Sequence, residues 1–96
     1  MRDPRIDQIA DEIERRFSGT IVVISPCPAP DEPDVDWMMD VLNLPLERHR
    51  ELTRFTLELG DRLFPGENHP FLAGGVTPEW TELHYSQYLH GTPARP

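Results

Sequence analysis

This chain of 96 residues lacks lysine, has a single cysteine and contains no long hydrophobic run. All nine basic residues are arginine, and 17 acidic residues bring the net charge to −8. An acidic surface repels the phosphates of nucleic acids and of anionic membranes, so we expect neither as a partner. The longest unbroken apolar run, Ile21–Ile24, is far shorter than the roughly 20 residues of a membrane-spanning helix.

The lone cysteine, Cys27, has no partner for a disulfide within the chain, which is typical of a reducing compartment. The first residues, MRDPRIDQ, are charged and lack the apolar segment of a secretory signal. We therefore expect a cytoplasmic protein. The length indicates one domain, which we place at residues 1–91, followed by a tail at 92–96 that is disordered unless it docks on the rest.

Two segments combine a capped start with the apolar spacing of a helix. One begins at Asp3-Pro4 and ends before Gly19, because Asp is a good N-cap and Gly favours the left-handed C-terminal position. The other begins at Thr77-Pro78 and ends at His90-Gly91. The first buries one apolar face, which is formed by Ile6, Ile9, Ala10, Ile13 and Phe17.

Two further helices are predicted in the middle of the chain. Residues 46–64 carry charges on one side and two apolar stripes on the other, which indicates a helix packed against two neighbours. Gly60 lies between the stripes and suggests the close approach of another backbone, because glycine costs about 1 kcal/mol relative to alanine in a helix. Residues 34–43 are apolar on most of their surface and are predicted as a short helix buried on several sides.

Residues 20–25, TIVVIS, form the one strong strand, and Pro26 ends it because proline has no N–H for a ladder hydrogen bond. A buried strand needs a hydrogen-bonded neighbour. Two neighbours are identifiable: residues 71–76, FLAGGV, and the same strand of a second copy, antiparallel about a two-fold axis. The expected fold is α+β and mostly helical, with about four helices around one short strand.

The proline-rich segment at residues 26–33, PCPAPDEP, predicts a stiff, extended connection. Within it, Pro30–Pro33 matches the PxxP spacing of SH3-domain ligands. Its acidic surroundings and the lack of a flanking arginine argue against that role.

A few residues could carry catalysis or bind a metal. Ser25 and Cys27 lie at the C-terminal end of the predicted strand, where sites form in α/β proteins, and His69 is a third candidate. His69 and His84 are the candidate metal ligands, although the histidines lack the spacing of known zinc motifs. A small enzyme or ligand-binding protein with its site at this end of the strand is therefore the alternative function.

The function we expect is a non-catalytic module that acts through protein–protein contacts, without a cofactor and as a homodimer. The strand without an obvious mate and the broad apolar side of residues 46–64 both favour it. Aromatic side chains with a polar tip are also enriched at interfaces. The candidate interface residues are Ile21, Val23, Trp37, Met38, Trp80, Tyr85 and Tyr88.

Overall fold

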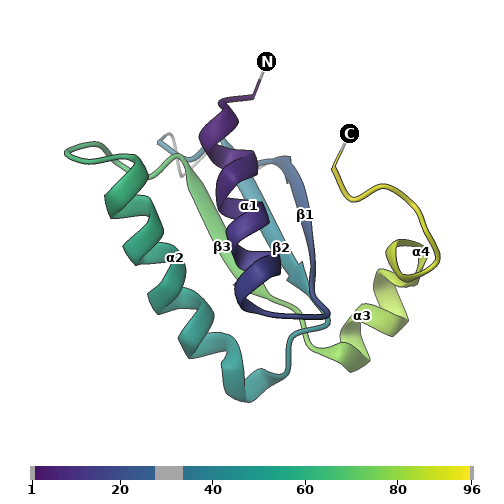
Figure 1. The fold of residues 1–96 in the computed structure, drawn as a ribbon. Coiled ribbons are helices and arrows are strands. Elements are labelled where there is room, and N and C mark those ends of the chain that lie inside the picture. The colour runs from purple at the N-terminus through teal and green to yellow at the C-terminus, as the bar shows by residue number, and fades with distance from the viewer. Residues whose placement is uncertain (1, 28–33, 96) are drawn as a thin grey trace.

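The computed structural model describes residues 2–27 and 34–95, which fold into a small sheet and four α-helices (Figure 1). The strands are β1 (Ile21–Pro26), β2 (Trp37–Leu42) and β3 (Phe71–Gly75). The helices are α1 (Pro4–Arg16), α2 (His49–Leu63), α3 (Pro78–His84) and α4 (Ser86–Leu89), and a short 3-10 helix, η1 (Leu46–Arg48), leads into α2. The expected α+β class is confirmed, whereas the expectation of a mostly helical fold around one strand is wrong in part.

β2 is the central strand of a sheet whose order is β1-β2-β3. β1 pairs with β2 in antiparallel fashion, and β3 pairs with β2 in parallel fashion. β1 therefore has a mate in its own chain, namely the segment that was predicted as a helix. The neighbour that was expected within the chain, residues 71–76, does supply a strand, but that strand pairs with β2. The reason for pairing β1 across a homodimer, that its own chain offers no good mate, is thus wrong.

The helix predicted at residues 34–43 is wrong because β2 occupies most of this range. A central strand is covered on both faces, so apolar residues follow one another without a clear period of two. Met39 and Val41 face α1 and α2 in the core, while Met38 and Asp40 face the opposite side. Short apolar runs of this kind do not distinguish a buried strand from a buried helix.

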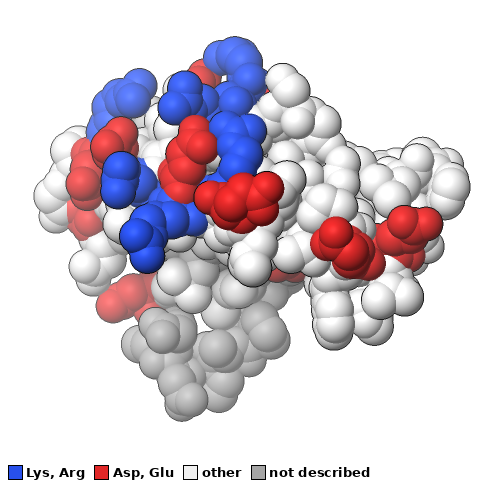
Figure 2. Space-filling model, turned by 90° about the horizontal axis from the view of Figure 1, so that it is seen from below, with Lys and Arg blue, Asp and Glu red and all other residues white. Residues whose placement is uncertain are grey.

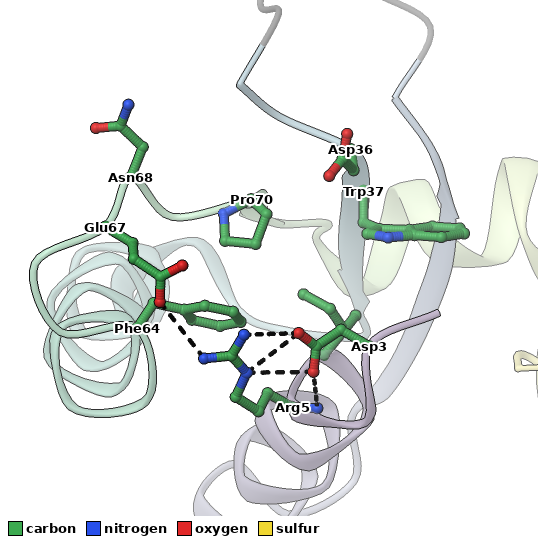
Figure 3. A pocket seen from close by; sticks show the side chains of 9 residues that line it. Asp3, Arg5, Asp36, Trp37, Phe64, Glu67, Asn68 and Pro70 are labelled. Carbon is green, nitrogen blue, oxygen red and sulfur yellow. Dashed lines mark hydrogen bonds and ion pairs between the residues drawn. The ribbon is translucent and has the colours of Figure 1, made fainter. Parts of the chain in front are cut away.

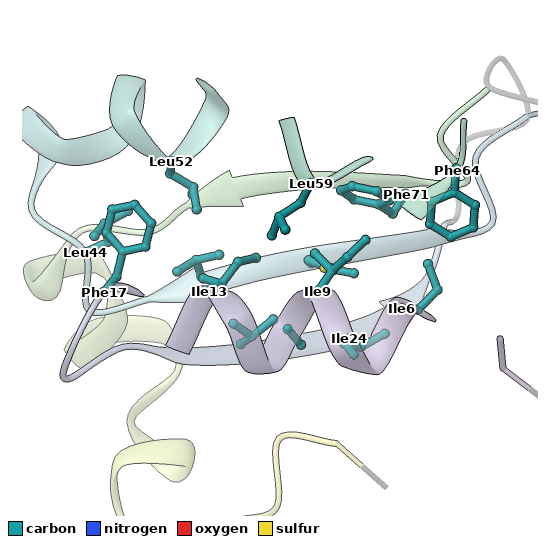
Figure 4. Close-up of a cluster of buried hydrophobic side chains, with 14 residues drawn as sticks. Ile6, Ile9, Ile13, Phe17, Ile24, Leu44, Leu52, Leu59, Phe64 and Phe71 are labelled. Carbon is teal, nitrogen blue, oxygen red and sulfur yellow. The ribbon is translucent and has the colours of Figure 1, made fainter. Parts of the chain in front are cut away.

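The hydrophobic core lies between one face of the sheet and the helices α1 and α2, which cover the same side (Figures 1 and 4). α1 contributes Ile6, Ile9 and Ile13 as its spacing predicts, and all three are fully buried. Phe17 follows the helix and meets Phe55 of α2 edge to face, with 5.8 Å between the ring centroids. The predicted start of this helix is confirmed, since Asp3 accepts a hydrogen bond from the backbone N–H of Arg5 at 2.9 Å.

Gly60 makes room for a side chain in α2, and not for a backbone as expected. A Cβ atom at this position would overlap the ring of His69. That ring stacks on Phe71 of β3, and its Nε2 donates to Asp61 Oδ1 at 3.0 Å. The glycine in the last turn of α2 therefore leaves room for the ring of His69, which contacts both α2 and β3.

The C-terminal segment leaves β3 and returns beside β1 (Figure 1). The helix expected between Thr77 and His90 is divided at Tyr85 into α3 and α4. In the tail, Arg95 docks on α1 through ion pairs with Asp11 at 2.8 Å and Glu14 at 2.9 Å.

The expected PxxP motif at Pro30–Pro33 lies outside the residues that the structure describes. Within residues 2–27 and 34–95, no helix combines the length and apolar character needed to cross a membrane.

Candidate interaction surface

The face of the sheet opposite α1 and α2, called the helix-free face here because neither of these two helices covers it, is only partly covered, and Tyr85 of the C-terminal segment lies near Asp40 on it. Along β2, Leu42 is fully buried, whereas Asp40 and Met38 are half-buried. In the register of the sheet, Met38 lies beside Leu72 of β3, which is 44% exposed. Coverage therefore decreases along β2 toward Met38, where apolar side chains of two strands reach the surface.

Three of the candidate interface residues lie on this helix-free face and one does not. Ile21, Val23 and Met38 share the face by strand alternation, although Val23 is buried there. Trp37 points to the other side, against the core, and the guanidinium of Arg2 lies 5.4 Å from its ring centroid. Trp37 therefore lies on the opposite face of the sheet from Ile21, Val23 and Met38.

The remaining candidate interface residues belong to the C-terminal helices. Trp80 is 53% exposed, and its ring centroid lies 4.2 Å from that of His84. Tyr85 and Tyr88 are half-buried, and their ring centroids are 6.3 Å apart. The two tyrosines therefore pack partly on the protein, while Trp80 presents most of its ring to solvent.

Asp40 places a carboxyl group in the middle of the helix-free face, opposite Val23 on one side and Gly74 on the other. Burial raises the pKa of the Asp40 carboxyl. Burial also raises the pKa of the nearby Tyr85 hydroxyl, and the charge of Asp40 adds to this effect. An ionised carboxylate at this place is disfavoured, because few groups compensate for the water that it loses.

Charged side chains elsewhere are mixed in sign. Figure 2 shows arginines interleaved with acidic residues over the helical layer, whereas the part of the molecule formed by α3 displays acidic residues. Arg16 and Arg48, for example, both pair with Glu51, at 3.2 and 3.1 Å. This surface view contains no extended basic patch of the kind that a phosphate backbone needs.

A pocket of about 330 Å³ lies at the end of the sheet where β1 stops (Figure 3). Arg5 fills one side of it, with its guanidinium 4.0 Å from the ring centroid of Phe64. The same guanidinium binds both carboxylate oxygens of Asp3, donates to the carbonyl oxygen of Leu63 and pairs with Glu67 at 3.6 Å. The pocket has the volume of the smallest ligand sites, but Arg5, the one cation among its described lining residues, is already neutralised.

The structure does not gather the candidate catalytic and metal-binding residues. Neither Ser25, Cys27 nor His69 is among the described residues that line this pocket. Cys27 is half-buried, and its backbone N–H donates to the carbonyl oxygen of Asp36 at 2.9 Å. His69 lies between α2 and β3, whereas His84 stacks on Trp80. Within the described ranges, no group of three or more His, Cys, Asp or Glu residues is placed to hold a metal ion.

The outer edge of β1 is closed at two of its three outward N–H positions, Val22 and Pro26, on either side of Ile24. The backbone N–H of Val22 points away from β2 and donates to Glu14 Oε2 at 3.0 Å. Glu14 is in turn held by Arg95 through its other oxygen. Pro26, the last residue of the strand, has no N–H to offer. These devices are ones by which proteins protect an exposed edge strand.

The outer edge of β3 is open. Its ladder to β2 includes hydrogen bonds from Trp37 N–H to Pro70 O and from Val76 N–H to Val41 O. Alternate residues of a parallel strand face opposite edges, so the residues between these positions point their N–H and C=O groups outward. The outward residues are Phe71, Ala73 and Gly75. Among the described residues, none forms a hydrogen bond to these outward groups.

A small groove of about 120 Å³ lies between α2 and β3. Figure 1 shows α2 on the outer side of β3, away from β2, and the groove lies between the two. Its residues include Thr53, Thr56 and Leu57 from α2, His69 from the connecting loop, and Phe71, Leu72 and Ala73 from β3. One feature of the sequence indicates the edge that borders this groove: the strand FLAGG is short, as edge strands often are.

Apolar side chains and open backbone groups, more than titratable clusters, are thus the features that this structure offers to other molecules. The chain matches no family model, no curated protein and no solved structure.

Proposed function

We propose that the chain is a small non-catalytic module that acts through protein–protein contacts and associates with a second copy through the helix-free face of its sheet. The observation that carries this proposal is the partial coverage of that face. Leu72 is 44% exposed beside the half-buried Met38, on a sheet whose other face is fully occupied by α1 and α2. Exposed apolar patches of this kind mark interaction sites.

A second copy suits this face because a two-fold axis would cover the same residues on both protomers. Sheets pack face to face at about 10 Å, with their side chains interdigitating, so Met38 and Leu72 of one copy would cover those of the other. The charge of Asp40 opposes such packing. Association is therefore expected to strengthen when this carboxyl is neutral.

Sedimentation velocity of the wild-type protein and two matched variants tests the proposal. Leu72→Asp introduces a charge on the helix-free face, and Leu46→Asp introduces the same charge on η1, where the leucine is 70% exposed. We expect a wild-type dimer that Leu72→Asp dissociates and Leu46→Asp preserves. A wild-type monomer at high micromolar concentration would contradict self-association, and equal effects of the two variants would place the interface elsewhere.

The pocket beside Arg5 supports a second candidate, a protein that binds a small ligand at the end of β1. A ligand there would have to compete with Asp3 and Glu67 for the guanidinium of Arg5. Native mass spectrometry of protein purified without an affinity tag separates the two functions. A dimer of unmodified mass favours the interaction module, and a monomer with a constant additional mass favours the ligand-binding protein.

A further inference from the structure

We propose that the open edge of β3 binds an extended segment of a partner protein, which adds to the sheet as a fourth strand beside α2. This surface is separate from the helix-free face and extends the proposed function to a second kind of partner. Strand addition of this type uses backbone hydrogen bonds for affinity and pockets for alternate side chains for specificity.

The backbone of β3 determines the shape of this partner. The N–H and C=O groups of Phe71, Ala73 and Gly75 point away from β2 at intervals of two residues. Only another extended chain repeats its donors and acceptors at this interval. At the opposite edge, the outward N–H of Val22 is already occupied by Glu14 and Pro26 has none, so that among the described residues of β1 only Ile24 keeps an available outward N–H and β3 offers the longer run of edge groups.

The groove determines which side chain the segment presents to α2. Its volume of about 120 Å³ is well below the roughly 300 Å³ of the smallest sites for drug-sized ligands, and suits a single side chain. The hydroxyls of Thr53 and Thr56 both donate to carbonyl oxygens of their own helix, at 3.2 and 3.0 Å. With these hydroxyls engaged, the groove favours an aliphatic residue over a polar one, beside Leu57 and Ala73.

Two histidines hold α2 and β3 apart, His69 at the groove and His49 near the end of β3. His69 fits against Gly60 and stacks on Phe71, while His49 fits against Gly75 and donates from Nε2 to the carbonyl oxygen of Leu44 at 2.8 Å. A larger residue at Gly60 or Gly75 would occupy the space that these two rings fill. The spacing between α2 and β3 is therefore fixed before a partner binds, which reduces the entropic cost of binding.

A separate segment fits this edge better than a second β3 does. Paired strands lie about 4.8 Å apart, whereas packed helices need about 8–10 Å between their axes. Since α2 lies on the outer side of β3 (Figure 1), two copies joined through β3 would bring their α2 helices together above the shared axis. An extended segment without such a helix avoids this conflict.

Residue-resolved NMR with a blocked peptide of alternating threonine and valine tests the proposal. At millimolar peptide, we expect the amide signals of Phe71, Ala73 and Gly75 to shift most. N-methylation of one alternate set of peptide amides should abolish these shifts, and methylation of the other set should preserve them. Absence of shifts, shifts centred elsewhere, or equal effects of the two methylated peptides would overturn the proposal.

Variants of the protein supply the second arm of the test. Ala73→Pro removes an outward N–H without removing a bond to β2, and we expect it to weaken peptide binding at least about tenfold. Thr53→Phe fills the groove from the exposed side of α2, and Glu58→Phe is its control on the same helix. Binding that survives Thr53→Phe, or that Glu58→Phe weakens equally, contradicts the proposed site.

The same variants separate this proposal from self-association. Ala73→Pro is expected to keep the oligomeric state of the wild-type protein, because the helix-free face is unchanged. Loss of the dimer together with peptide binding would show that both use the β3 edge and would overturn the assignment of that edge to a separate segment.

Discussion

The two edge strands of the sheet differ in how far their outward backbone groups have hydrogen-bond partners, although both strands are short and apolar. At β1, the outward N–H of Val22 is bonded to Glu14, Arg95 holds Glu14, and Pro26 ends the strand. At β3, the outward groups of Ala73 and Gly75 have no such partner among the described residues. The closed edge draws on α1, which directly precedes β1, and on the tail, which is far from β1 in sequence.

The β1 edge is therefore largely protected against pairing with another strand, whereas the β3 edge is available for it. An unprotected edge strand is a site of aggregation unless something limits what can pair with it. In this protein, the overhanging helix α2 and the narrow groove beneath it limit access to β3 without forming hydrogen bonds to it. The contrast predicts that disturbing the β1 edge reduces stability, whereas disturbing the β3 edge mainly alters binding.

The largest effect is expected at the closed edge. Glu14→Ala leaves the N–H of Val22 without an acceptor and removes one of the two ion pairs of Arg95, so the free energy of unfolding should fall by about 1–3 kcal/mol. Glu12→Ala on the same helix loses only its exposed pair with Arg15 and should cost at most about 0.5 kcal/mol. Urea unfolding measures both, and equal losses would contradict a special role for the β1 edge.

A smaller effect is expected where α2 meets β3, and its sign depends on whether His69 is present. Gly60→Ala gains about 1 kcal/mol of helix propensity but forces the ring of His69 to move, which costs about 1–3 kcal/mol. The net result should be a loss of about 1 kcal/mol in the free energy of unfolding. In a His69→Ala background, the same substitution should stabilise the protein, and a loss in both backgrounds would show that His69 is not the obstacle.

The smallest effect is expected from Asp40 on the helix-free face, and it depends on pH. Because burial raises the pKa of this carboxyl, its ionised form opposes folding, and the penalty is relieved as the pH falls through the raised pKa. Asp40→Asn should therefore stabilise the protein most at neutral pH, with a difference that narrows in acid. Asp3 and Glu51, whose pKa values are lowered by arginines, act in the opposite direction in both proteins. A constant difference across pH would contradict this account.

The sequence predicted the helical layer well because its signals are local. The cap at Asp3, the apolar spacing of residues 6–17 and the charged side of residues 46–64 each depend on neighbours within a few turns. The strand at residues 20–25 was recognisable from its β-branched run and its ending at Pro26. These elements needed no knowledge of what they pack against.

The sheet and the interaction surfaces could not be predicted in the same way, because they depend on pairing between distant segments. Residues 37–42 carry apolar side chains on both faces, so their period identifies neither strand nor helix. The separation of Trp37 from Met38 follows only once residues 37–42 form a strand. The groove beside β3 requires both α2 and the position of β3 at an edge, and neither Gly60 nor His69 reveals this alone.

Amide hydrogen exchange of the protein without peptide tests the contrast between the two edges most directly. The amides of Leu72 and Gly74 face β2, and that of Val22 is bonded to Glu14, so all three should be protected. The amides of Ala73 and Gly75 should exchange far faster than their neighbours in the same strand. Protection of Ala73 equal to that of Leu72 and Gly74 would show that the β3 edge is already occupied and would contradict the account.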